Sequence, residues 1–167
     1  MVVCNERLVL DVAQVVRDTF TRWARRTYRQ CMRAATVIDL LLKESGCDTD
    51  STFSYAEYGW MGRVTGTGVP AAKNTGHVWN IVRFADGNDW LLDVTADQFN
   101  RLLKKQFPPI IWGPRQAMID RYGYIYADDY RLSVYDVHPQ FVTVARHRLR
   151  TGRWLKLPTR EQCALLK

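Results

Sequence analysis

Residues 77–95 read His-Val-Trp-Asn-Ile-Val-Arg-Phe-Ala-Asp-Gly-Asn-Asp-Trp-Leu-Leu-Asp-Val-Thr, and they decide the fold of this chain. Two runs rich in β-branched and aromatic residues, 77–84 and 90–95, flank the turn sequence Asp86-Gly87-Asn88. Such runs on either side of an Asp-Gly turn predict two antiparallel strands joined as a hairpin. An antiparallel sheet is therefore expected at the centre of the sequence.

Two amphipathic helices are expected before the hairpin. Across residues 7–27 the apolar residues recur at steps of three and four, which is the spacing of one helix face. A second helix is expected over 31–45, where Ser45-Gly46 ends it. No residue between 28 and 31 breaks a helix, so one continuous helix remains an alternative. The inner face of the second helix holds Cys31, Ala34, Ala35, Ile38, Leu41 and Leu42.

The other segments complete an α+β pattern in a single domain, 1–167. Residues 52–58 alternate and predict a short strand, residues 59–76 form a glycine-rich loop, and 98–106 predict a short helix. Further strands are expected in the C-terminal third, from Tyr122, Tyr124, Tyr126, Tyr130, Tyr135 and the run Phe141–Val144. Helices followed by antiparallel strands indicate N-terminal helices packed on an antiparallel sheet.

The composition is that of a water-soluble, basic protein, with a formal net charge of +7 and a pI near 9.4. No apolar run approaches the roughly 18 residues of a membrane span, and no secretory signal is visible at the N-terminus. Synthesis in the cytosol is expected, and delivery to another cell by a route without a cleaved signal remains open. Cys4, Cys31, Cys47 and Cys163 lack the spacing of metal ligands, so free thiols are expected, with no metal and no cofactor.

The positive charge is concentrated in two segments. Residues 16–33 hold six arginines against one acid, Asp18, and residues 146–160 hold six cations and no acid. Such segments favour an acidic protein as partner, and nucleic acid is a second possibility. A solvated basic face without a partner is an equally ordinary interpretation.

A set of four residues in sequence order carries the chemistry of a thiol enzyme. Such an enzyme needs a thiolate, a base beside it, an acid that orients the base, and a donor for the oxyanion. Cys31 opens a helix, His77 opens a strand, and Asp93 lies on the next strand. Gln98 follows with a side-chain amide that is able to donate. Each residue taken singly is more often structural than catalytic, so the prediction rests on the ordered set.

Three segments resemble the core of papain-like and transglutaminase-like cysteine enzymes. They are Cys31-Met-Arg-Ala-Ala, Gly76-His77-Val-Trp79 and Asp93-Val-Thr-Ala-Asp-Gln98-Phe99, and the likeness spans about residues 31–99. The closer likeness is to the glutamine deamidase domains of dermonecrotic-type bacterial toxins and effectors, in which a glutamine after the aspartate serves the oxyanion hole. The resemblance implies a Cys31–His77–Asp93 triad with Gln98 as oxyanion donor. It also implies deamidation or transamidation of a glutamine side chain on a protein.

Two alternatives stay open at the site. If the hairpin turns tightly at Asp86-Gly87, Asp97 lies opposite His77 and is the better-placed partner, whereas Asp93 needs a bulge or a wider loop. Trp79 and Trp60 are candidates for an apolar wall of the substrate site, and equally for the core. A papain-like thiol peptidase, or a basic binding protein without catalysis, is the alternative function.

Overall fold

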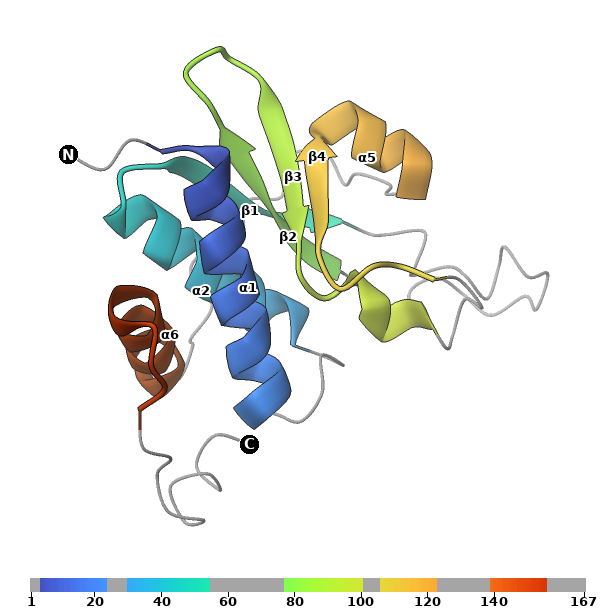
Figure 1. Ribbon diagram of the computed structural model, residues 1–167. Helices are drawn as coiled ribbons and strands as arrows, with labels where there is room; N and C mark the ends of the chain where they lie inside the picture. Colours follow the sequence, from blue (N-terminus) through green and yellow to red (C-terminus); the bar gives the residue numbers. More distant parts are fainter. Residues whose placement is uncertain (1–3, 24–29, 55–76, 101–105, 123–138, 156–167) are drawn as a thin grey trace.

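The computed structural model describes residues 4–23, 30–54, 77–100, 106–122 and 139–155 (Figure 1). The elements follow one another as α1 (Glu6–Trp23), α2 (Cys31–Glu44), β1 (Asp48–Ser54), β2 (His77–Arg83), β3 (Asp89–Asp93), the 3₁₀ turn η2 (Ala96–Phe99), β4 (Ile111–Pro114), α5 (Arg115–Tyr122) and α6 (Pro139–Thr151). The second helix begins at Cys31 as expected, with Gln30 as its N-cap, and residues 24–29 between α1 and α2 lie outside the described residues. The glycine-rich segment 59–76, with Trp60, lies outside the described residues.

The four strands form one antiparallel sheet in the order β1-β2-β3-β4. The predicted hairpin is β2–β3, but its loop is wider than a two-residue turn. Phe84 to Asn88 separate the strands, the Gly87 N–H donates to the carbonyl of Phe84, and Gly87 has a φ of 79° that favours glycine. The resulting register sets Asn80 opposite Leu92. The wider loop is the alternative that brings Asp93, and not Asp97, toward His77.

Alternate residues of the strands face two different cores. On one face the sheet packs against α2, while α1 and α6 pack against α2 and against each other; Figure 1 shows these three helices together on that side. This helix-side core contains Val9, Val12, Val16, Phe20, Ile38, Leu42, Val82, Leu92 and Phe141. On the other face α5 packs against β3 and β4, over an outer core of Trp79, Ile81, Leu91, Ala96, Phe99, Phe107, Ile111 and Ile119. The expected arrangement of N-terminal helices on an antiparallel sheet is confirmed.

The C-terminal third was assigned to strands by the sequence, and this prediction is wrong for Phe141–Val144. These residues lie in α6, whose buried side chains are Phe141, Val144 and Ala145. Their spacing of three and four is helical, and Phe141 stacks on Phe20 of α1 at 4.6 Å between ring centroids. Tyr122 ends α5, and Tyr124 to Tyr135 lie outside the described residues. A helix was expected over 98–106: the 3₁₀ turn η2 begins earlier, at Ala96, and residues 101–105 lie outside the described residues.

The expectation of free thiols is wrong for two of the cysteines. Cys4 and Cys47 form a disulfide, with their Cα atoms 5.1 Å apart. It ties the segment before α1 to the residue that follows the C-terminal turn of α2, so it fastens one end of the helical layer. Cys31 is free and buried, and Cys163 lies outside the described residues. No helix among the described residues is both long and apolar enough to cross a membrane.

Candidate active site

Cys31 is the first residue of α2 and lies beside the N-terminal end of the inner strand β2. Its side chain packs against Ala35 and Val78, and the residue is 8% exposed. The backbone N–H of Val78 donates to the sulfur. Gln30, before it, makes no side-chain cap to the helix, and its carbonyl accepts the first intrahelical bond, from Ala34. The thiol therefore lies at the positive end of a helix of 14 residues.

His77 is the first residue of β2, and its side chain is completely buried. Its Nε2 atom lies 2.5 Å from Oδ2 of Asp93, a short contact between two buried groups. The imidazole and the Phe99 ring form a T-shaped pair, with the centroids 5.0 Å apart and the planes at 89°. A second side-chain hydrogen bond joins His77 to Cys31. Since Asp93 occupies Nε2, Nδ1 is left as the nitrogen that exchanges a proton with the thiol.

Asp93 reaches His77 because of the register of the hairpin. Continuing the pairs beyond Asn80 and Leu92 sets Asp93 opposite Trp79, on the same face as His77 two residues away. The other carboxylate oxygen, Oδ1, accepts from the backbone N–H of Thr95 at 2.8 Å and from its hydroxyl at 3.3 Å. Thr95 thus fixes one carboxylate oxygen of Asp93, while the second oxygen faces the imidazole.

The rival carboxylate, Asp97, is directed elsewhere. Both of its oxygens contact the guanidinium of Arg17 on α1, at 3.0 and 2.5 Å. This pair could not be predicted from the sequence, because Arg17 is one of six arginines that together suggested a basic surface. Thr95 was also missed as a partner of Asp93, although an Asp followed two residues later by Thr is the spacing of a local side-chain-to-backbone turn.

Gln98 lies in η2, partly buried, and approaches the same imidazole. Its side-chain nitrogen is 3.3 Å from Nδ1 of His77. Gln98 therefore approaches the nitrogen that Asp93 leaves open. The structure thus brings together the four residues that the sequence pattern selected. Trp79, in contrast, is 1% exposed and packs in the outer core.

The electrostatics of the pair favour a proton on the imidazole. Burial would lower the pKa of His77, but the charge and hydrogen bond of Asp93, with those of Cys31, raise the pKa to about 10. For the Cys31 thiol, burial acts in the opposite direction and would raise the pKa. The hydrogen bond and charge of His77, with the Val78 N–H, outweigh it and lower that pKa from its ordinary value. A thiolate beside an imidazolium is the form that attacks carbonyl carbon.

Among the residues that the structure describes, no group of three or more His, Cys, Asp or Glu side chains is placed to hold a metal ion. Comparison of the chain with models of protein families, with curated proteins and with solved structures finds no match.

Proposed function

We propose that the chain is a cysteine-dependent acyl-transfer enzyme with a papain-like or transglutaminase-like core, in which Cys31 is the nucleophile and His77 its base. The observation that carries the proposal is the hydrogen-bonded series from Cys31 through His77 to Asp93, buried at a helix N-terminus. A structural histidine needs no thiol on its second nitrogen. The lowered pKa of Cys31 is what a nucleophilic cysteine requires.

The first half of the reaction forms a thioester. The Cys31 thiolate attacks the carbonyl carbon of an amide, and the electron pair of the C=O bond moves onto oxygen. The side-chain amide of Gln98 donates to this oxyanion, together with a backbone N–H beside Cys31. The carbon–nitrogen bond then breaks as His77 gives its proton to the leaving ammonia or amine. Asp93 keeps the imidazole in the orientation that this proton transfer needs.

The second half restores the enzyme. Water attacks the thioester carbon while Nδ1 of His77 takes a proton from it, and the carbon–sulfur bond breaks to release a carboxylic acid and the Cys31 thiolate. A primary amine in place of water gives a new amide, which is transamidation. The same residues serve both outcomes, and access of water or amine to the thioester selects between them.

A glutamine side chain on a protein is the proposed substrate. The support is the stretch from Asp93 to Phe99, whose pattern Asp-x-Thr-Ala-x-Gln-Phe resembles that of glutamine deamidases. Deamidation releases ammonia and leaves the backbone intact, whereas the alternative, thiol peptidase activity, cuts the chain. Mass spectrometry of a treated protein substrate separates the two.

The test compares wild-type protein with Cys31→Ala. We expect wild-type protein to release ammonia from a glutamine-containing acidic peptide, and the variant to release none. Iodoacetamide should alkylate Cys31 at near-neutral pH ahead of Cys163, with Cys4 and Cys47 protected in their disulfide. Cys163→Ala is the matched control and should keep the activity. Ammonia release that survives Cys31→Ala would contradict the proposal.

An acidic region of the protein substrate is the proposed docking partner. Two basic segments that are far apart in the sequence meet at Trp154: the guanidinium of Arg22 lies 5.4 Å from the ring centroid and that of Arg148 lies 5.1 Å from it. A cleft of about 370 Å³ opens beside them, lined by Asp18, Thr21, Arg22 and Trp154. Exposed Arg153, next to Trp154 in the sequence, adds positive charge beside this cleft.

Charge reversal tests the docking surface. Arg148→Glu should raise the KM for an acidic protein substrate and leave the alkylation of Cys31 by iodoacetamide unchanged. Arg7→Glu, at an exposed arginine near the other end of α1, is the matched control. The same basic surface favours the second candidate function, a nucleic-acid-binding protein without catalysis. That function predicts nucleic-acid affinity that falls steeply with salt and survives Cys31→Ala.

A further inference from the structure

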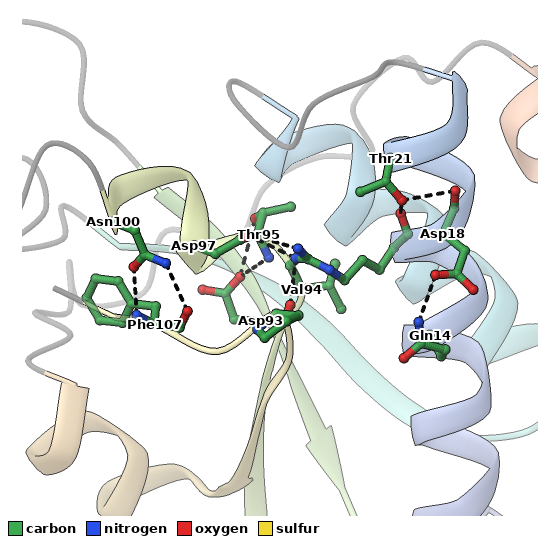
Figure 2. Close-up of polar contacts among 11 residues, drawn as sticks. Gln14, Asp18, Thr21, Asp93, Val94, Thr95, Asp97, Asn100 and Phe107 are labelled. Carbon is green, nitrogen blue, oxygen red and sulfur yellow. Dashed lines mark hydrogen bonds and ion pairs between the residues drawn. The ribbon is translucent and has the colours of Figure 1, made fainter.

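Arg17 connects α1 to the segment that carries two of the proposed site residues. Its guanidinium is largely enclosed, with 12% of the side chain exposed. It reaches from α1 to the chain after β3, and Figure 2 shows the dashed contacts that meet Val94 and Asp97 there. Nη1 donates to the Val94 carbonyl at 2.7 Å, and Nη2 contacts the Asp97 carboxylate at 2.5 Å.

The acceptors of Arg17 are the immediate neighbours of the site residues. Val94 follows Asp93, and Asp97 precedes Gln98. A third acceptor, the carbonyl of Pro109 at 2.7 Å, lies in the segment that leads into β4. One planar group therefore fixes both ends of the segment 94–97 and ties it to the neighbouring chain. Arginine suits this role because its donors are rigid and point in several directions at once.

The Val94 side chain also packs in the helix-side core, so Arg17 supplies the polar part of the attachment of this segment to the helical layer. η2 is a single turn of four residues, and its N-cap Thr95 makes no side-chain cap to it. Thr95 instead holds Asp93, at 2.8 Å from its backbone N–H. A shift of this turn would move the Asp93 carboxylate and the Gln98 amide in the same direction, because only Val94 to Asp97 separate them.

We infer that Arg17 is a positioning residue of the active site, which sets Asp93 and Gln98 relative to His77 through Val94 and Asp97. The inference rests on the proposed function of Cys31 and His77. It also gives Asp97 a role: with both oxygens on Arg17, this carboxylate is held away from the imidazole and anchors the turn.

The test compares Arg17→Met with Arg17→Lys and with Arg83→Met. Methionine keeps most of the length of arginine and removes every donor, whereas lysine keeps one charge for Asp97 without spanning all three acceptors. Arg83 is the matched control, because it joins Asp48 and Asp89 by ion pairs at the opposite end of β2. The probes are iodoacetamide, for the pH dependence of Cys31 alkylation, and a glutamine-containing acidic peptide, for kcat and KM.

In Arg17→Met we expect the apparent pKa of the Cys31 thiol to rise by about one unit, because His77 loses a well-placed Asp93. The kcat should fall by about tenfold or more, since small misplacements in a site cost this much, with KM changed by less than about twofold. Arg17→Lys should recover part of both losses. Arg83→Met should match the wild-type protein in both.

The outcomes are distinguishable. Folded Arg17→Met with the thiol pKa and kcat of the wild-type protein would overturn the inference while leaving the proposed function standing. If Arg17→Met does not fold, Asp97→Asn and Arg17→Lys take its place, and wild-type values in both of these overturn it equally. A wild-type Cys31 that titrates as an ordinary thiol removes the proposed function, and the role of Arg17 with it.

Discussion

Cys31 and His77 hold one proton between them, and this has a consequence for stability. In the folded chain the pKa of Cys31 is lowered from 9.0 and that of His77 is raised from 6.5, so the proton resides on the imidazole. The stability that comes from His77 is present below pH 6.5 and is lost as the pH rises toward about 10. The stability that comes from Cys31 has the opposite sign: it is present above pH 9.0 and is lost as the pH falls through the lowered pKa.

Above both pH 6.5 and the lowered pKa of Cys31, and below pH 9.0, the two contributions compensate, because folded and unfolded chains each hold one proton on this pair. The free energy of unfolding due to the pair is therefore expected to be flat in this window. In Cys31→Ala the contribution of Cys31 is removed and only that of His77 remains. The free energy of unfolding should then fall with rising pH, by up to about 1.4 kcal/mol per pH unit. Urea unfolding of both proteins across the window measures this difference. Equal pH slopes in the two proteins would refute the shared proton.

At the same scale, the sequence pattern selected four residues that lie together in the structure, but it did not predict the contacts among them. Cys31, His77, Asp93 and Gln98 follow from the types and order of the residues. The choice between Asp93 and Asp97 did not follow, because it depends on the width of the loop at Phe84–Asn88 and on a partner 80 residues away, Arg17. A shift of one or two positions in register changes which side chains lie opposite His77.

At the scale of elements, prediction succeeded where one face of an element is buried by its neighbours. All six residues that the spacing assigned to the inner face of α2 are buried, and the helix ends at the expected Ser45-Gly46, where Gly46 has a φ of 83°. The assignment of Phe141–Val144 to a strand failed because a short apolar run fits either period. The distinguishing residue is Ala145, which extends the buried stripe of α6 to the helical spacing.

Alanine substitutions in α6 check this helical packing. Phe141→Ala should lower the free energy of unfolding by about 3–5 kcal/mol, because the ring stacks on Phe20 inside the helix-side core. Thr143→Ala, exposed on the same helix, should change it by less than about 0.5 kcal/mol. In a strand, residues 141 and 143 would share one face. Comparable losses in the two variants would therefore contradict the helix, and chemical unfolding measures both.

At the scale of the whole molecule, the disulfide and the candidate site lie at opposite ends of one helix. Cys31 begins α2 and Cys47 follows its last turn, so the 14 residues of the helix separate them by about 20 Å. The disulfide closes a long loop, with a sequence separation of 43 residues. Its effect is therefore expected on the stability of the chain as a whole, by limiting the unfolded state, and not on the geometry at Cys31.

The double variant Cys4→Ser/Cys47→Ser separates global stability from the local chemistry. We expect its free energy of unfolding to fall by about 2–4 kcal/mol, as removal of a long-loop disulfide typically does. The pH dependence of Cys31 alkylation by iodoacetamide should stay that of the wild-type protein, because Val78, His77 and Asp93 keep their contacts with the thiol and with one another. Chemical unfolding and alkylation rates, both measured well below the midpoint temperature of unfolding, give the two quantities. A folded double variant whose Cys31 has lost its reactivity would mean that the disulfide acts on the site through α2, and the helix would then have to transmit a change along its whole length.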